Sequence, residues 1–592
     1  MTTSTRQVAQ NPVSSAIPII IGVTGHRDLR AEDIPALEQR VGKIFQGLRI
    51  QYPNTTLLVL SPLAEGADRL VARVALEQGV QLVVPLPLPR VEYAQDFNTP
   101  TSTAEFNALL GQAAKCFELP LMAGNTPANI QYDGPHREKQ YAQVGAYIVR
   151  HSQILIALWD GVDTGLEGGT GQIVHFKLQG IPEPYALPHN PLDAIDTGPV
   201  YHILTPRVKN PHPEGAAFSL CIKFPKDSED ADALQRSYDR ILEQMNTFNR
   251  DVKRLVPKLT EDIEKHKRHV IPEAKTHTLP DTAHAVLEQY GVADALAIHC
   301  QSWRRRTLIA LFVMALLAVV SFEVYAHLLG QPWVLALYPV TLGLALLLYV
   351  LARQKDFHHK HLDYRALAEG LRVQLFWHLA GLPDAVADHY LRKQRTELEW
   401  IRHAIRAWNV PGIQSSAVAH PGAAFQASAQ DYIRPLKELV FPHWVKHQCQ
   451  YFEGATNRDH KKLKRHEHTV NWLFGFGLLL AIAVVILHSR FHDSEVYQHW
   501  YHWLIVIMGT APAIAAAMGG YAEKMAFSAQ AKRYRWMHVL FARASMQLQA
   551  FLNQSALREA QQLILDLGKE ALEENGDWVI IHRERTLEVP RG

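Results

Sequence analysis

Three glycine-containing segments near the amino terminus combine residue types that bind anions. The first, residues 22–28 with the sequence GVTGHRD, contains Thr24, Gly25, His26 and Arg27. Glycines let the backbone approach a ligand, main-chain N–H groups point readily at a phosphate, and an arginine adds a charged fork. This segment therefore predicts phosphate binding.

The second segment, residues 61–69 with the sequence SPLAEGADR, places Gly66 at an expected turn from strand to helix. Ser61 and Glu65 on this turn are expected to bond the hydroxyls of a ribose. Asp68 has two interpretations, either a ligand contact or a residue that caps and charges the start of the helix.

The third segment, residues 160–172, is rich in glycine, follows an expected strand and opens a helix. In that arrangement a helix dipole holds an anion. The residues expected at the anion are Asp160, Gly168, Gly169, Thr170 and Gly171. Two arginines elsewhere, Arg137 and Arg207, are further candidate phosphate partners, and a surface or ion-paired arginine is the alternative for each.

Alternating apolar runs and helical patterns position these segments. Residues 17–23 form an isoleucine-rich run of the kind that is buried on both faces of a parallel sheet. The expected strands are 17–23, 57–60, 82–88, 154–160 and 201–204, and the expected helices are 33–49, 67 onward, 138–151 and 172 onward. This alternation predicts an α/β, Rossmann-like, doubly wound sheet that binds ligands at the carboxyl ends of its strands.

Residues 17–207 resemble the SLOG domain, a Rossmann-like relative of the Lonely Guy phosphoribohydrolases. The motifs that carry the resemblance are VTGHR at 23–27, SPLAEGADR at 61–69, LIALWDG at 155–161 and GGTG at 168–171. The resemblance implies a domain, over residues 1–207, that binds nucleotides or nucleotide-derived signals. ADP-ribose-like molecules and cyclic nucleotides are the expected ligands, and no other cofactor is expected.

The chain departs from the hydrolytic relatives at one signature. Those relatives carry P-G-G-x-G-T-x-x-E, whose final glutamate serves catalysis. Here Glu167 replaces the proline, Gln172 the threonine and His175 the glutamate. The departure implies a pocket that binds without hydrolysing, while Glu65 or Asp160 as general base keeps hydrolysis open as the alternative.

Two apolar hairpins, residues 308–352 and 472–520, are long enough to cross a bilayer twice each. The four expected spans are 308–326, 333–352, 472–487 and 503–520. Lys and Arg cluster outside the hairpins, as at 304–306 and 461–465, whereas the short loops within the hairpins carry almost none. The positive-inside rule then places both termini and the large domains in the cytoplasm.

A helix, span, span, helix order occurs twice after a linker and transmitter segment at 208–299. Each copy, 300–425 and 426–592, resembles the SLATT domain, a two-span effector module associated with SLOG sensors in prokaryotic conflict systems. The match is one of layout, together with the carboxyl-terminal run 567–578. The resemblance implies a prokaryotic inner-membrane location and a role in antiviral defence.

Residues inside the expected spans suggest packing and gating. Gly509 and Ala513 are small residues at helical spacing that permit close helix approach, and Pro512 is expected to kink the fourth span or to be a tolerated bend. Glu323 lies near the outer end of the first span. A carboxylate there either reaches the membrane interface or lines a cation path.

Composition excludes some functions. A net charge of +2 gives no general field for nucleic acid. The four cysteines lack the C-x-x-C spacing of a zinc site or disulfide framework, so no metal is expected. The leading hypothesis is a homo-oligomeric membrane effector, not an enzyme, that is gated by a nucleotide-derived signal. A membrane-anchored nucleotide hydrolase and a passive scaffold are the alternatives.

Overall fold

The computed structural model describes residues 15–583 except 98, 188–192, 194, 226–230, 392–397, 411–428, 492 and 525–526. The chain forms two compact units, and most of its elements are helices. The sheet unit comprises Met1–Val292, Leu367–Tyr432 and Gly568–Gly576. The apolar-helix unit comprises Ala293–Ala366, Ile433–Leu567 and Asp577–Gly592.

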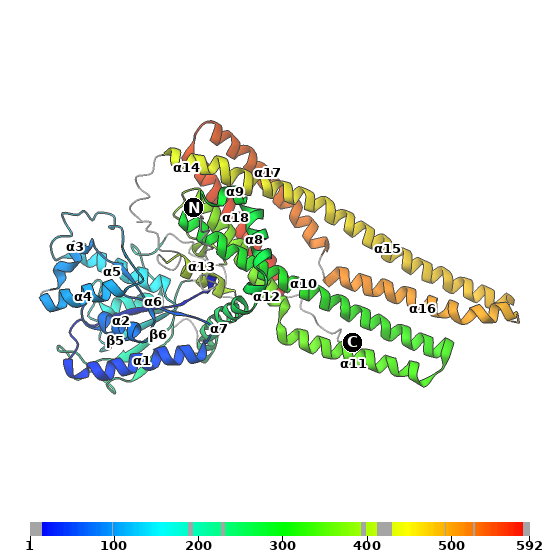
Figure 1. The fold of residues 1–592 in the computed structure, drawn as a ribbon, viewed down its shortest axis with the longest axis horizontal. Coiled ribbons are helices and arrows are strands. Elements are labelled where there is room, and N and C mark those ends of the chain that lie inside the picture. The colour runs from blue at the N-terminus through cyan, green and yellow to red at the C-terminus, as the bar shows by residue number, and fades with distance from the viewer. Residues whose placement is uncertain are drawn as a thin grey trace, which may run out of the picture. The chain divides into compact units, whose positions relative to one another are not determined.

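A seven-stranded sheet with the order β4-β3-β2-β1-β5-β6-β7 organises the sheet unit (Figure 1). Its strands are β1 (Ile19–Gly25), β2 (Leu57–Leu60), β3 (Gln81–Leu86), β4 (Lys115–Glu118), β5 (Ile154–Trp159), β6 (Val200–Leu204) and β7 (Leu220–Lys223). All neighbours pair in parallel except β6 and β7. The prediction of an α/β unit with a mainly parallel sheet is confirmed, and β4 and β7 are strands that the sequence did not reveal.

Helices between the strands bury the apolar faces of the sheet. They are α1 (Ile34–Gln51), α2 (Ala67–Glu77), α3 (Arg90–Tyr93), α4 (Pro100–Gln112), α5 (Pro135–His151) and α6 (Thr170–Gln179). α1 packs on α2 and α5 packs on α6, while α2, α5 and α6 also contact β1. Right-handed crossovers place these two pairs on opposite faces of the sheet. This covering explains why Ile19, Ile20 and Ile21 are all fully buried.

The two edges of the sheet are short. β4 and β7 each have four residues, and each carries a lysine, Lys115 in β4 and Lys223 in β7. The remaining helices of this unit include α7 (Ala231–Leu255), α8 (Thr260–Val270), α9 (Glu273–Thr276) and α13 (Glu399–Trp408). α13 packs on α5 and α7, and its Arg402 and Arg406 pair with Asp196.

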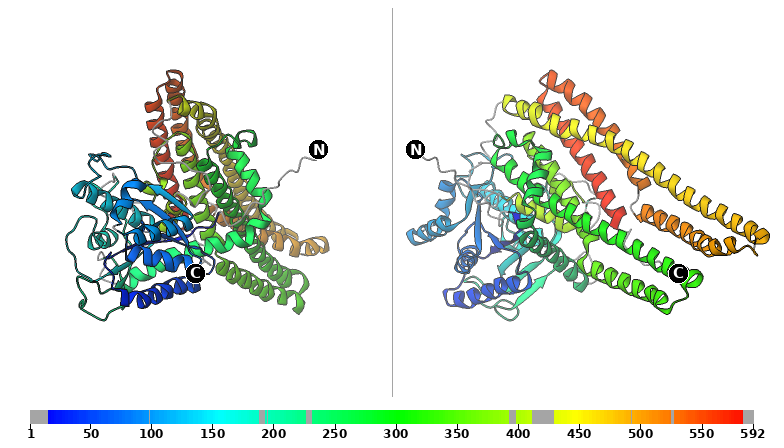
Figure 2. Two further views of the ribbon diagram at one scale, coloured as in Figure 1. Left: turned by 60° about the vertical axis from the view of Figure 1, so that its left-hand side comes forward. Right: turned by 45° about the vertical axis from the view of Figure 1, so that its right-hand side comes forward.

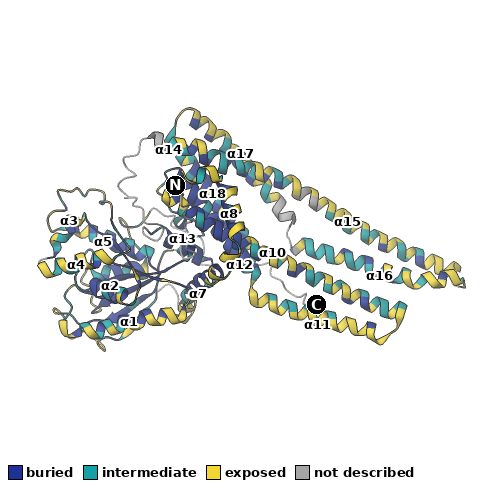
Figure 3. Ribbon diagram, in the orientation of Figure 1, coloured by how far each residue is buried: buried dark blue, intermediate teal, exposed yellow. Residues whose placement is uncertain are grey.

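Four helical stretches, Asp281–Leu329, Pro332–Leu379, Lys464–Phe491 and Glu495–Glu523, are long and apolar enough to cross a membrane. They belong to the helices α10 (Asp281–Val324), α11 (Pro332–Lys355), α12 (Phe357–Leu379), α15 (His447–Phe491) and α16 (Glu495–Lys524). Large apolar side chains on these stretches are exposed, among them Leu346 and Leu479. Figure 3 shows exposed and intermediate residues along α11, α15 and α16. Exposed apolar surface of this extent marks a membrane or partner surface, and the prediction of four apolar helices is confirmed.

Each apolar hairpin pairs two neighbouring helices, as the two views in Figure 2 show. α15 packs along α16, and Phe322 of α10 contacts Tyr338 of α11 with ring centroids 6.0 Å apart. α10 and α15 each continue without interruption from the preceding amphipathic segment into the apolar one. α11 and α12 are separated by Asp356, whose φ is +51°.

The carboxyl-terminal part is also helical. α14 (Ala429–Pro435) leads through a π-helical segment, Leu436–Lys446, into α15, and α17 (Phe527–Asn553) and α18 (Leu557–Arg583) follow α16. The helix, apolar hairpin, helix order therefore occurs twice. The predicted boundary between the two copies, 425/426, lies outside the described residues.

Candidate functional site

The carboxyl ends of β1 and β5 form the switch point of the sheet. β1 pairs with β2 on one side and with β5 on the other, with Gly25 opposite Leu158. The chain builds β1 to β4 in one direction and then returns to the other side of β1. Sheets of this kind bind ligands between the loops after β1 and β5, and this region is called the crevice below. These loops are the first and third sequence segments, which the structure thus brings together.

Gly66 joins the second segment to the first. Its φ is +79°, and a Cβ at this position would lie 2.4 Å from the carbonyl oxygen of Arg27 and 2.5 Å from that of His26. The Ala67 N–H donates to the same His26 carbonyl at 3.0 Å. A side chain at residue 66 would push the two loops apart, so the absence of a side chain here allows the loops to contact each other.

Asp160 directly follows β5 and holds the loops of the crevice together. Its carboxylate accepts hydrogen bonds from Val162 N at 3.1 Å, Arg207 Nε at 2.9 Å and Asn210 Nδ2 at 3.1 Å, and Oδ1 lies 3.0 Å from His26 Nε2. Burial alone would raise the pKa of Asp160, but these hydrogen bonds hold it below its usual value. Both oxygens of the carboxylate therefore have hydrogen-bond donors, so Asp160 and Arg207 fix the loop structure.

Within the first segment, Arg27 is the side chain that reaches solvent. Thr24 and His26 are each 8% exposed, whereas Arg27 is exposed. Burial lowers the pKa of His26 even though Asp160 opposes the effect, so the imidazole is neutral at neutral pH. Its Nε2 also lies 3.1 Å from the backbone nitrogen of Asp160.

Arg27 and the glycine-rich segment are linked through Tyr141 of α5. The Arg27 guanidinium lies 5.5 Å from the centroid of the Tyr141 ring, within the range of a cation–π contact. A Cβ on Gly168, whose φ is +74°, would lie 2.8 Å from the Tyr141 Cβ. Arg27, Tyr141 and Gly168 therefore form one continuous wall of the crevice.

The hydroxyl of Ser61 faces the protein interior. Ser61 is completely buried, and its Oγ donates to the carbonyl of Asp68 at 3.3 Å and accepts from the Leu63 N–H at 3.2 Å. Glu65 is partly exposed and accepts a hydrogen bond from the hydroxyl of Ser102 on α4. Glu65 is therefore the carboxylate of the second segment that remains accessible at the crevice.

Asp68 is 5% exposed and lies in the first turn of α2. Burial raises its pKa to about 7, although Arg27 and Arg69 and a hydrogen bond from the Ala64 backbone act in the opposite direction. The charged form of this carboxyl is therefore costly at this depth.

Arg137 is also part of the interior. It is 3% exposed, and its guanidinium donates to the carbonyls of Ile130 at 2.6 Å and Glu92 at 2.8 Å. It also donates to Asp96 Oδ1 at 2.5 Å and to the Tyr141 hydroxyl at 2.8 Å. These contacts connect the segment before α4 to α5, so Arg137 has a structural role.

The third segment ends at the amino terminus of α6, where Gly169 is the N-cap and Thr170 the first helical residue. The backbone N–H groups of such a first turn carry partial positive charge. An acidic side chain of the protein already lies there, because a Cβ on Gly171 would be 2.8 Å from Asp163 Oδ1. Asp163 Oδ2 also lies 3.3 Å from Nε2 of His175.

Three residues of this site escaped the sequence reasoning: Asp96, Tyr141 and Asp163. Tyr141 follows Arg137 by one helical turn, and this spacing is a usable signal for two side chains on one face. Asp163 lies within the third segment but outside its glycine stretch. Asp96 ends a short 3₁₀ helix, Ala94–Asp96, that no motif marks, and only the fold brings it to Arg137.

In the apolar-helix unit, two glycines provide close contacts between helices. A Cβ on Gly509 would lie 2.9 Å from Oε1 of Glu323, and a Cβ on Gly477 would lie 2.9 Å from Pro512 Cγ. The structure therefore brings Glu323 of α10 and Gly509 of α16 together. Ala513 is partly exposed, and the buried alanines of α16 are Ala511 and Ala515.

Among the described residues, no group of three His, Cys, Asp or Glu side chains is arranged to hold a metal ion. No protein-family model matches the chain, and no curated protein matches it either.

Proposed function

We propose that this chain is a membrane effector that binds a nucleotide-derived anion at the crevice between β1 and β5. The observation that carries the proposal is the presence, in one chain, of this switch-point crevice and of four helices long and apolar enough to cross a membrane. Crevices at the carboxyl ends of parallel strands are the usual ligand sites of such sheets.

Electrostatics favours an anion at this crevice. Arg27 presents an exposed positive charge beside Tyr141. Gly168 lies against the same tyrosine and leads directly into the first turn of α6. A ligand with a phosphate and a planar base fits such a wall, because guanidinium and helix amides hold the phosphate and an aromatic ring stacks on the base.

The crevice also contains an internal competitor for that anion. Asp163 lies against Gly171 in the first turn of α6, the place that a phosphate would take. A ligand phosphate displaces Asp163, and the loop from Gly161 to Glu167 then changes its conformation. A ligand acts on the membrane helices only through such a difference in affinity between two conformations.

The assembly proposed for this function is a homo-oligomer in a prokaryotic inner membrane, with both termini cytoplasmic. Four spans rarely form a pore by themselves, which favours several copies around a common path. The resemblance of the sheet unit to SLOG domains, and of the helical layout to SLATT modules, extends the proposal to permeabilisation of the membrane in antiviral defence.

A membrane-anchored nucleotide hydrolase is the second candidate, and the accessible Glu65 carboxylate is the observation that favours it. Asp160 fits this role less well, because breaking its four contacts would be needed before it accepted a proton. If the chain is a hydrolase, Glu65→Gln abolishes turnover of the nucleotide. The same change leaves the oligomer intact.

The test is efflux of a dye and of ions from liposomes that contain the purified full chain. A panel of ADP-ribose derivatives and cyclic oligonucleotides is added, and each nucleotide is recovered afterwards. We expect efflux while the nucleotide stays intact. Efflux is lost in Arg27→Ala and retained in the control Arg254→Ala, which changes an exposed arginine on α7. Consumed nucleotide with sealed liposomes would establish the hydrolase instead.

A further inference from the structure

A cavity of about 740 Å³ lies in the sheet unit away from the crevice. One face of α5 forms a wall of it, with Gln143, Tyr147, Arg150 and His151 at the spacing of successive helical turns. Other walls come from β4 and the loop after it, from residues 184–187 and 281–282, and from residues within 374–385 and 409–410. The volume lies within the range of about 300–1,000 Å³ that is typical of small-molecule sites.

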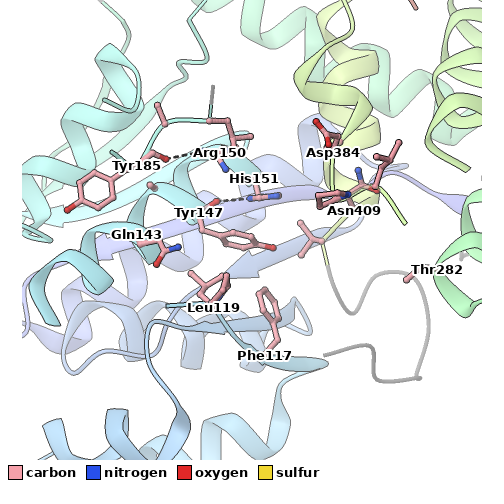
Figure 4. Close-up of a pocket in the computed structure, with 18 of the residues that line it drawn as sticks. Phe117, Leu119, Gln143, Tyr147, Arg150, His151, Tyr185, Thr282, Asp384 and Asn409 are labelled. Carbon is pink, nitrogen blue, oxygen red and sulfur yellow. Dashed lines mark hydrogen bonds between the residues drawn. The ribbon is translucent and has the colours of Figure 1, made fainter. Parts of the chain in front are cut away.

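Aromatic rings line the cavity (Figure 4). The Tyr147 ring lies between His151, stacked on it at 4.0 Å between centroids, and Phe117, edge-on at 5.6 Å. Leu119 lies beside Phe117 in the same wall. Flat apolar surfaces of this kind hold a planar ring by stacking and contact with its faces.

Several polar groups on the lining have unused hydrogen-bonding capacity within the described part of the chain. The Tyr147 hydroxyl makes no hydrogen bond there. Nδ1 of His378 is buried and also has no hydrogen-bond partner there. Asn409 donates through Nδ2 to Gln374 at 3.3 Å, which leaves its carbonyl oxygen as an acceptor. Gln143 accepts from Gln140, which leaves its own amide hydrogens as donors.

Charges on the lining balance. Lys115 and Arg150 are opposed by Asp281 and Asp384, and burial lowers the pKa of His151 to about 3, so its ring is neutral. A balanced lining offers no net attraction to a polyanion, in contrast to the exposed Arg27 of the crevice. Mixed neutral donors and acceptors beside aromatic rings match the edge of a nucleobase, which side-chain amides recognise well.

We propose that this cavity is a second ligand site, which binds an uncharged nucleobase or nucleoside with its ring against Tyr147. The ligand would contact α5 and β4 together with residues within 374–385 and 409–410, and so would hold together parts of the sheet unit that are far apart in the sequence. This inference does not depend on the nucleotide proposed for the crevice.

Calorimetric titration of the purified full chain with adenosine, guanosine, cytidine and uridine tests the proposal. Saturable binding of at least one nucleoside is expected. Tyr147→Phe, which removes only the hydroxyl, weakens it by about 2- to 10-fold. Ala186→Trp, which fills the cavity from its lining, abolishes it. Tyr132→Phe, on an exposed side chain, is the matched control and leaves the affinity unchanged.

Three results would overturn the proposal. The first is absence of saturable binding of all four nucleosides at millimolar concentration. The second is binding that survives Ala186→Trp and disappears in Arg27→Ala, which would assign the nucleoside to the crevice. The third is tighter binding of the 5′-monophosphate than of the nucleoside, when that difference persists in Arg27→Ala, since it would contradict an uncharged ligand.

Discussion

The buried carboxyl of Asp68 makes the stability of the sheet unit depend on pH. Its pKa is about 7 in the folded chain, against about 3.9 for an unperturbed aspartate. Because the folded state binds the proton more tightly, its stability falls as pH rises from about 4 to about 7. Each pKa unit corresponds to about 1.4 kcal/mol, so the total loss is on the order of 4 kcal/mol.

Changing Asp68→Asn removes this cost, since asparagine is neutral at every pH and keeps an acceptor for the Ala64 N–H. We expect the variant to match the wild-type chain at pH 4 and to exceed its stability increasingly up to pH 7, with a constant difference above. Thermal unfolding of the full chain in detergent, followed by tryptophan fluorescence from pH 4 to 8, measures this. Asp133→Asn, on a fully exposed carboxylate, is the control and leaves the profile unchanged.

The reasoning would be refuted if Asp68→Asn destabilised the chain at pH 8 by as much as at pH 4 or more. That result would mean that Asp68 is ionised in the folded state and that its attraction to Arg27 and Arg69 outweighs its burial.

Three further substitutions have expected outcomes. Gly66→Ala forces a side chain into a left-handed turn against two carbonyls, and we expect a loss of at least about 2 kcal/mol in unfolding free energy and loss of nucleotide-induced efflux. Asp160→Asn removes the charge that lies 2.9 Å from Arg207 Nε and leaves the more distant Asp28, at 3.7 Å, as the remaining carboxylate, so we expect a loss of about 1.5–3 kcal/mol in unfolding free energy, measured by denaturant unfolding. Gly509→Leu clashes with the carboxylate that it contacts and lowers the melting temperature in detergent, whereas Gly519→Leu, with open space around it, does not.

Periodicity in the sequence predicted the elements better than their ends. Buried parallel strands and apolar hairpins leave long, one-sided signals, so β1, β5 and the four apolar helices were expected near their observed positions. The sequence marks a change from amphipathic to apolar composition, and α10 and α15 each run through that change as one helix. Helix propagation needs only an unbroken backbone, and no proline interrupts either helix.

Motif spacing located the crevice but not the direction of its side chains. Ser61 and Arg137 have the right chemistry and neighbourhood for a ligand, yet both point into the interior. A shift of one residue along a strand, or of a fraction of a turn along a helix, reverses the side on which a side chain lies. The cavity beside Tyr147 was beyond sequence reasoning, since its walls come from segments hundreds of residues apart.

The two edge strands restrict how copies of this chain can associate. An exposed edge strand offers unpaired backbone groups to a neighbouring chain, and short strands with charged side chains discourage such pairing. β4 and β7 have both properties, four residues each with Lys115 and Lys223. Growth of a continuous intermolecular sheet is thereby disfavoured at both margins. An oligomer of this protein would then form through helical surfaces, so that its copy number is set by helix packing and can remain finite.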